Sequence, residues 1–327
     1  MRDLVQDNFE IIELPESEVI SEPGFYRISL ERHHNQPCDG PSVTSGVLRK
    51  MELESPADVW AFHRLNPNRW ESKQTDALRL GRAMACFVEG GPELLEEEFR
   101  ALPENKPKRP TPAQMKAYNE GRGTEAGIRS VEFWANVEAD SRDIITEAEW
   151  EQLCNMGKVL VADPAASAVM DGVPEVSMAW KDERTGIWCL ARPDTVSFSG
   201  LVTDYKKMAT RGTSFNERLV DHRITQHGYD MQGAFACEGF KQLTDHWPSF
   251  GIIAQWDSPP HHVILREISD EDLRIGAFRN NRALTRVREC LDSGIWPGPG
   301  ETTGVYRRPD WQREMLLEEM QIEGKAP

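Results

Sequence analysis

The hydrophobic period of the chain changes after Gly172, and this change constrains the fold more than any other feature of the sequence. Three strand-length segments joined by short turns come first, at residues 175–180, 187–192 and 201–206. A helical segment over about 215–244 follows, and then strands around 250–256 and 263–267. Strands, a long helix and further strands, set among other helices, predict an α/β or α+β core.

Capping signals place the helices outside this core. Ser55 is followed by Pro56 and by an acid at the third helical position, which is typical of a helix start. A second helix is expected from Thr75 to Gly90–Gly91, with Gly81 and Ala85 on its buried face and something packed closely against Gly81. A capping box at Thr146 and an amphipathic segment over 270–292 predict two more helices.

The chain is acidic as a whole. Its 327 residues carry a formal charge of −16, which argues against a histone-like or generally basic coat protein. The stretch from Lys106 to Arg129 is the most basic window, and it is expected to be a loop that is either a solvated connector or faces DNA. We predict one domain over 1–327, with an accessory segment (1–54), a catalytic core of sheet and helix (172–267) and a C-terminal helix and tail (268–327).

The N-terminal residues and the cysteines indicate where such a chain works. Acids stand near the N-terminus where a signal peptide would be apolar, and no stretch reaches the roughly 18 apolar residues of a spanning helix. We therefore expect a cytoplasmic protein without membrane contact. The six cysteines are widely scattered and form no CxxC pair, so neither a zinc ribbon nor an iron–sulfur cluster is expected.

One constellation carries chemistry: Asp194, Asp204 and Lys206 lie on a predicted hairpin. Side chains alternate along a strand, so Asp204 and Lys206 point to the same side. If Asp194 closes the preceding strand, the two carboxylates converge and need a cation between them, with Mg²⁺ or Mn²⁺ preferred by such oxygen ligands. A lysine beside the metal could orient a water or neutralise a phosphate oxygen, as metal-assisted phosphodiester hydrolysis requires.

Asp194, Asp204 and Lys206 resemble the signature of the PD-(D/E)XK nuclease superfamily, whose core is a mixed central sheet flanked by helices. The surrounding blocks resemble the RecE-type exonuclease VIII group of phage recombination nucleases, here with helical N-terminal additions. The blocks run in the order Pro23–Tyr26, Ser55–Ala57, Leu65–Pro67, Leu78–Ala83, Glu175–Ser177, Ala191–Asp194, Gly228–Gln232 and Trp296–Gly298. The resemblance covers about residues 20–312, and the order is more specific than any single block.

The resemblance implies roles for the residues of the signature. Asp194 and Asp204 would bind the catalytic Mg²⁺ or Mn²⁺ ions, and the backbone carbonyl of Tyr205 would complete a metal shell. Lys206 would assist the attacking water. These assignments follow from the family's pattern, position by position.

Further residues follow from the same pattern, and two positions depart from it. Gln232 and Tyr229 match residues of the helix that contacts the site or the DNA. Glu175 matches a strand glutamate, although a strand-edge carboxylate facing water is an equal alternative. Ala85 stands where the family has a metal-binding histidine, and Ala236 where it has a tyrosine near the phosphate. These losses put metal affinity in question, while both carboxylates and the lysine are kept.

The resemblance implies a metal-dependent exodeoxyribonuclease that resects double-stranded DNA ends and leaves single-stranded tails for recombination by annealing. Its expected partners are the DNA ends and a single-strand annealing protein, and it is expected to form a homo-oligomeric ring. The alternative is a catalytically weakened PD-(D/E)XK protein that holds DNA ends without efficient cleavage.

Overall fold

The computed structural model describes residues 10–71, 75–197, 200–210, 212–300 and 304–322. Among these residues the strands, in chain order, are β1 (Ile11–Glu13), β2 (Gly24–Arg27), β3 (Ser42–Thr44), β4 (Phe99–Leu102), β5 (Asp143–Thr146), β6 (Gly172–Pro174), β7 (Ser177–Lys181), β8 (Trp188–Ala191), β9 (Thr195–Ser197), β10 (Leu201–Met208), β11 (Ser249–Trp256) and β12 (Val263–Glu267). The helices are α2 (Leu30–His34), α3 (Ser45–Leu53), α4 (Pro56–Phe62), α5 (Asp76–Glu98), α6 (Pro112–Asn119), α7 (Glu125–Glu138), α8 (Glu147–Ala162), α9 (Pro164–Val169), α10 (Glu217–His227), α11 (Tyr229–Thr244), α12 (Asp270–Ser293) and α13 (Asp310–Ile322).

The fold is a mixed α/β architecture built around two sheets. One sheet has the order β1-β2-β7-β8-β3 and the other β12-β11-β10-β9-β6. In the second sheet β10 and β11 are parallel, while β9 and β12 run antiparallel to their neighbours. The chain passes from β10 to β11 through α10 and α11, which is the crossover that parallel strands require. The α/β expectation is confirmed.

Helix α11 lies between the two sheets and joins them into one core. Gly239 faces Trp180 of β7, where an added Cβ would come within 2.5 Å of the indole. Gly233 faces Phe250 of β11, where an added Cβ would come within 2.4 Å of the ring. The two glycines therefore let one helix approach both sheets closely. The other face of the second sheet is covered by α5, α8 and α9, through residues such as Met84 and Met156.

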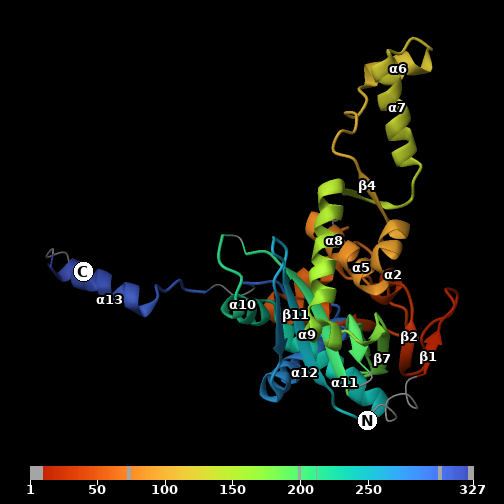
Figure 1. The fold of residues 1–327 in the computed structure, drawn as a ribbon. Coiled ribbons are helices and arrows are strands. Elements are labelled where there is room, and N and C mark those ends of the chain that lie inside the picture. Colours follow the sequence, from red (N-terminus) through yellow and green to blue (C-terminus); the bar gives the residue numbers. More distant parts are fainter. Residues whose placement is uncertain (1–9, 72–74, 198–199, 211, 301–303, 323–327) are drawn as a thin grey trace.

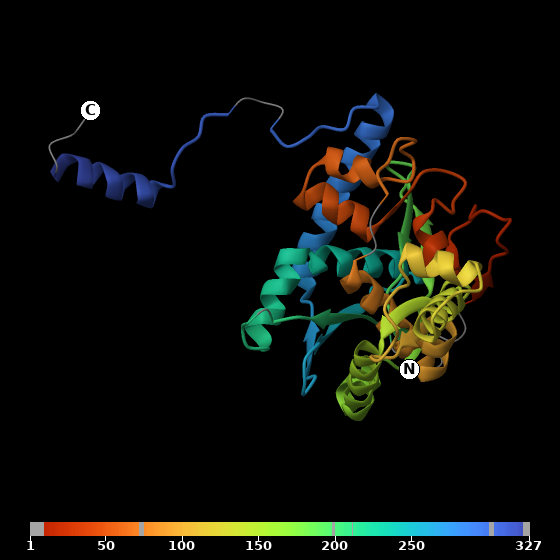
Figure 2. The same cartoon turned by 90° about the horizontal axis from the view of Figure 1, so that it is seen from above.

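Two parts protrude from this body. Helices α6 and α7 form an arm that extends from β4 and β5, and α13 lies apart from the body at the C-terminal end of the described chain (Figures 1 and 2). None of the helices in the described residues is long and apolar enough to span a bilayer.

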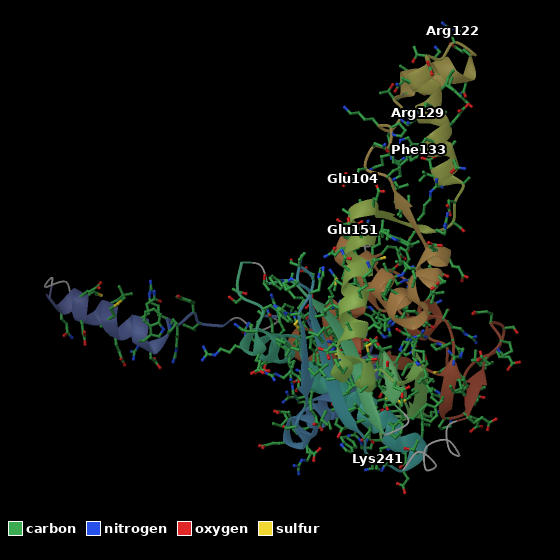
Figure 3. The ribbon with its side chains drawn as sticks, in the orientation of Figure 1. Glu104, Arg122, Arg129, Phe133, Glu151 and Lys241 are labelled. Atoms are coloured by element: carbon green, nitrogen blue, oxygen red, sulfur yellow. The ribbon has the colours of Figure 1, made fainter. Side chains whose placement is uncertain are left out.

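The basic window from Lys106 to Arg129 is a loop in its proline-rich first part, as expected, but it is mostly helical from Pro112 onward, where the expected loop is wrong. Its Thr111 and Thr124 side chains cap α6 and α7 locally, which stabilises a helical hairpin after the prolines. Arg122 near the tip of the arm pairs with Glu120, and Arg109 pairs with Glu138 (Figure 3). Part of the positive charge of the arm is therefore neutralised, and its contact with DNA stays a hypothesis.

Three other expectations need correction. The expected helix over 215–244 is two helices, because Gly228 adopts a left-handed conformation with φ of 64° between α10 and α11. The expected close packing at Gly81 is wrong, since an added Cβ there would meet nothing within 4 Å. The chain does bend at Gly91, whose φ is 70°, but helical structure resumes and continues to Glu98.

Candidate active site

Asp194 lies at the point where the chain passes from one sheet to the other. It follows β8 of the first sheet and directly precedes β9 of the second, so the predicted hairpin strands at 187–192 and 201–206 belong to different sheets. Strand β9 pairs with β10 only at Val202 and Thr203, and beyond these two residues no strand within the described parts of the chain lies beside this edge of β10. The Tyr205 N–H donates a hydrogen bond of 2.5 Å to Asp194 Oδ2 on this open edge. The N–H and C=O of one strand residue point to the same side of the strand, so the Tyr205 carbonyl also points to this edge of β10.

Asp204 and Lys206 lie together on one face of β10. Asp204 is 2% exposed. The Lys206 ammonium pairs with Asp204 Oδ2, and Gln232 Nε2 of α11 donates to Asp204 Oδ1 at 2.9 Å. The Lys206 Nζ also lies 4.9 Å from the centre of the Tyr229 ring. The structure thus brings together Asp194, Asp204, Lys206, Gln232 and Tyr229.

Negative charge dominates the electrostatics of this cluster. Burial raises the pKa of Asp194 well above its usual value, and the charges of Asp204 and Glu175 raise it further against the opposing effect of Lys206. Burial alone would lower the pKa of Lys206, but Asp204 and Asp194 outweigh it and the pKa is raised. The Lys206 ammonium therefore faces the two carboxylates of Asp194 and Asp204, and further positive charge would be stabilised here.

Glu175 is not in a strand, contrary to expectation. It connects β6 to β7 with a left-handed φ of 51°, and its N–H donates to the Asp194 carbonyl. Its carboxylate accepts a hydrogen bond of 2.6 Å from Arg192 Nε and is largely buried, which excludes the water-facing alternative. Burial raises the pKa of Glu175 despite this partner. Arg192 was not predicted as a site residue, although it stands two positions before Asp194.

A cavity of about 630 Å³ opens over this cluster. Its walls come from α5, β10, α10 and α11, and it is lined by Leu78, Gly81, Ala85, Val88, Glu175, Asp194, Tyr205, Lys206, Lys207, Met208, Ala209, Arg223, Gln226, His227, Tyr229 and Asp257. Ala85 faces the cavity as expected. Ala236 is 4% exposed within the main core and is not among the lining residues. Gln226 and His227 were not predicted, because Gly228, which could have indicated the end of a helix, was included in one continuous helix.

The oxygens of the cluster suit a hard divalent cation. Two buried acceptors, Asp204 Oδ2 and Gln232 Oε1, accept no hydrogen bond within the described residues, although Asp204 Oδ2 does contact the Lys206 ammonium. Asp194 contributes a second carboxylate. The described residues contain no group of three His, Cys, Asp or Glu side chains close enough to form a complete ligand set. Carboxylate, amide and backbone oxygens are nevertheless the donors that Mg²⁺ and Mn²⁺ prefer, with water completing the shell.

Comparison with known proteins identifies the family. The model of a PDDEXK-like domain of unknown function (DUF3799) matches residues 48–309, which is most of the chain. The chain belongs to this PDDEXK-like family. Asp194, Asp204 and Lys206 all lie within the matched region, so the resemblance to the PD-(D/E)XK superfamily is confirmed. Membership in the narrower RecE-type group is a separate proposal.

One solved structure extends the comparison to the fold. The crystal structure of a candidate exonuclease from Eubacterium rectale matches this PDDEXK-like chain with a TM-score of 0.58 and 15% identity. The match covers 88% of this chain and 98% of the other. At this identity the likeness shows a shared fold. No curated protein matches the sequence.

Proposed function

We propose that the protein is a divalent-metal-dependent nuclease that hydrolyses phosphodiester bonds of DNA. The observation that carries this proposal is the convergence of Asp194, Asp204 and Lys206, of which Asp194 and Lys206 line one cavity and Asp204 is buried beside them. Membership in a PDDEXK-like family supports the same reaction class. The cavity is lined by Asp194, and Lys207 and Arg223 stand on its walls.

The residues of the cluster divide the work between metal binding and substrate binding. Asp194, Asp204 and the Tyr205 carbonyl would hold the cation, Mg²⁺ or Mn²⁺. When bound, the metal would activate a water and neutralise charge on the phosphate. Asp204 and Asp194 raise the pKa of Lys206, and its ammonium can orient the water or stabilise the charged phosphate.

The remaining residues would position these groups. Gln232 holds Asp204 through its hydrogen bond, and its free Oε1 can accept from a bound water. Tyr229 packs beside Lys206 and limits its movement. Glu175 is fixed by Arg192 and ties the loop before β7 to Asp194, so we assign it a positioning role.

We further propose that the substrate is the end of double-stranded DNA and that the chain is a RecE-type exonuclease. The ordered sequence blocks support this narrower assignment. Single-stranded tails left by resection would be used in recombination by annealing. A single-strand annealing protein would then be its partner, several copies of the chain would assemble around DNA, and the reaction would take place in the cytoplasm.

A second function is favoured by Ala85. This residue faces the cavity where the RecE-type pattern has a histidine, so one metal ligand of that pattern is lost from a position that could reach the site. A protein that binds DNA ends and cleaves them poorly is therefore the alternative.

Degradation of end-labelled linear duplex, with Mg²⁺, Mn²⁺ or chelator, tests both proposals. Asp204→Asn should lower the cleavage rate by about 10²–10³-fold or more, the scale of losing one preorganised charged group, while the fold persists. Glu151→Gln is the matched control, because this exposed carboxylate of α8 lies outside the cavity (Figure 3). An equal loss of cleavage in Asp204→Asn and Glu151→Gln would contradict the assignment of the active site.

Covalently closed circles separate the exonuclease from an endonuclease. They should survive under conditions in which linear duplex is consumed, and rapid cutting of closed circles would overturn the end-specific proposal. Tight binding of duplex ends without cleavage in any metal would instead favour the alternative function.

A further inference from the structure

A second cavity, of about 180 Å³, lies at the N-terminal end of α3. None of its lining residues lines the active-site cavity. Its titratable lining residues are all basic, namely His33, His34, His63 and Arg64, and no aspartate or glutamate of the described chain lines it. Because the chain as a whole has 54 acids against 38 lysines and arginines, a cavity with this lining favours a negatively charged occupant.

The first turn of α3 brings backbone donors to this cavity. Thr44, at the N-cap, and Val47, at the third helical position, both line it. The Thr44 side chain accepts no hydrogen bond from the first turn, and this turn contains no acidic residue. The N–H groups of a first helical turn have no partner within the helix, and the helix dipole adds partial positive charge there. The first turn of α3 is therefore suited to hold an anion.

His63 supplies a second donor that is independent of the helix. Its side chain is 6% exposed, and its ring stacks beside Trp60 with 5.9 Å between the ring centroids. The Leu65 N–H donates to His63 Nδ1 at 3.2 Å, so the neutral ring carries its proton on Nε2. This buried Nε2 has no acceptor among the described residues. Since a buried donor without a partner is costly, an acceptor is expected beside it.

Two arginines add positive charge around the cavity. Arg64 is exposed, lines the cavity and forms no ion pair with the described residues. Burial lowers the pKa of His34, and the charges of Arg192 and Arg64 lower it further. Burial likewise lowers the pKa of His33, and the charges of His34 and Arg192 act in the same direction. Groups that repel one another in this way would be stabilised by an anion placed among them.

We propose that this cavity binds a phosphate group, either as the free ion or as part of a nucleotide. The donors come from three parts of the chain: the first turn of α3, the His63 Nε2–H and the Arg64 guanidinium. A phosphate group offers at least three acceptor oxygens to such a set, whereas a carboxylate offers two.

This phosphate site is independent of the proposed nuclease chemistry. Its binding is measured without divalent metal and without DNA, whereas the active-site proposal is tested by cleavage. If no phosphate binds, the assignment of Asp194, Asp204 and Lys206 is unaffected. If the active-site variants keep full activity, the phosphate site is equally unaffected.

Isothermal titration calorimetry of the full chain with inorganic phosphate, in metal-free buffer, measures the binding. We expect saturable binding that Arg64→Gln weakens by about tenfold, the scale of one lost charge-assisted hydrogen bond. Arg274→Gln removes the same charge from an exposed position on α12 and should leave the affinity unchanged. The absence of saturable binding in the wild-type chain, or equal weakening in both variants, would overturn the proposal.

Thr44→Asp tests the first turn of α3 directly. Aspartate is a preferred N-cap residue, so its carboxylate should occupy the donors of this turn and keep the helix folded while it repels phosphate. We expect phosphate affinity to fall by at least about 100-fold, because like charges meet. Phosphate should also no longer raise the free energy of unfolding in urea, as it should in the wild-type chain.

Thr285→Asp is the matched control, because it adds the same charge at an exposed position on α12. It should keep both the affinity for phosphate and the gain in stability. Circular dichroism shows whether each chain is folded, and Arg64→Gln tests the site at an exposed residue that the fold does not need. Wild-type affinity in Thr44→Asp, or an equal loss in Thr285→Asp, would contradict the site.

Three further titrations establish where the anion binds and what carries it. Binding that is lost in Arg223→Gln but kept in Thr44→Asp would place the anion in the active-site cavity and overturn the proposal. Tighter binding of a nucleoside 5′-monophosphate than of inorganic phosphate would identify a nucleotide as the source, and equal or weaker binding the free ion. Acetate should bind at least about tenfold more weakly than phosphate, since it has fewer acceptor oxygens. Equal affinity for acetate would overturn the assignment to a phosphate group.

Discussion

Ala85 lies on the wall of the active-site cavity. Its place on the cavity wall follows from helical spacing in α5, and the sequence predicted this correctly. Gly81 lies one turn earlier on the same wall, and its exposure contradicts the close packing expected from a helical glycine. A glycine that opens a cavity and one that permits close packing give the same sequence signal, so only the structure separates them.

Replacing Ala85 with histidine should strengthen metal binding. A neutral imidazole at this position can reach the cavity and supply the ligand that the proposed RecE-type pattern has there. We expect Ala85→His to lower the metal concentration that gives half-maximal cleavage by about 10–100-fold, the scale of a neighbouring ligand's effect on affinity. Ala85→Leu, which adds bulk without a nitrogen, is the control. An unchanged metal titration in a folded Ala85→His protein would mean that the side chain does not reach the metal.

His33 makes the fold sensitive to acid. Its ring is 3% exposed and lies 3.0 Å from Ser177 Oγ. Burial, and then the charges of His34 and Arg192, hold its pKa well below 6.5. Below about pH 6.5 the unfolded chain gains a proton that folded His33 cannot take, so the free energy of unfolding should fall by up to about 1.4 kcal/mol per pH unit.

Urea unfolding at about pH 7.5 and about pH 5.5 measures this loss, which spans the ordinary histidine pKa. His33→Gln should reduce the difference between the two pH values, because glutamine does not titrate. His222→Gln, at an exposed position on α10, should leave the difference as in wild type. An identical pH dependence in His33→Gln would assign the acid sensitivity to other groups.

At the scale of elements, what could be predicted depended on how local the signal is. The capping boxes at Ser55 and Thr146 are present as expected, since each needs only residues within one turn. The break at Gly228 was missed because apolar spacing continues across it. Sheet membership was missed as well: β8 and β10 are close in sequence, but their pairing depends on strands β3 and β11, which lie far away along the chain.

The packing of α12 against α11 depends on Gly276. An added Cβ would lie 2.4 Å from the Asp230 carbonyl oxygen in the first turn of α11. Gly276→Ala should therefore destabilise the fold by about 1–3 kcal/mol and displace Tyr229 and Gln232, which lowers cleavage as well. Gly46→Ala in α3 is the control, since its Cβ would have its nearest neighbour at 3.7 Å. Unfolding and cleavage assays on both variants test this prediction. Equal free energies of unfolding for Gly276→Ala and Gly46→Ala would contradict the close contact at Gly276.

At the scale of the molecule, a net charge of −16 must be reconciled with the polyanionic substrate proposed above. The cavity wall supplies Lys207 and Arg223 to a local basic path. Composition predicted the acidic body. Composition could not show where the basic side chains lie together, because their positions depend on how β10 and α10 are placed beside each other.

The salt dependence of DNA binding tests this local path. Arg223→Gln should weaken binding of linear duplex and reduce the slope of log affinity against log salt by about 1, as expected for one lost phosphate contact. Fluorescence anisotropy in chelator measures binding without cleavage. Arg184→Gln, an exposed arginine in the turn between β7 and β8, should leave the slope unchanged. The same slope in both variants would place the DNA path elsewhere.

The position of Asp194 between the two sheets has a consequence for the newly made chain. Its carboxylate meets Tyr205 only when β8 and β9 are held in their separate sheets, and Gln232 and β11 are synthesised later still. A ribosome-bound or truncated chain that lacks β11 would have neither the parallel neighbour of β10 nor the packing that fixes α11. Such a chain is expected to be inert toward the cell's own DNA, because cutting can begin only after synthesis has passed residue 256 and the fold has closed.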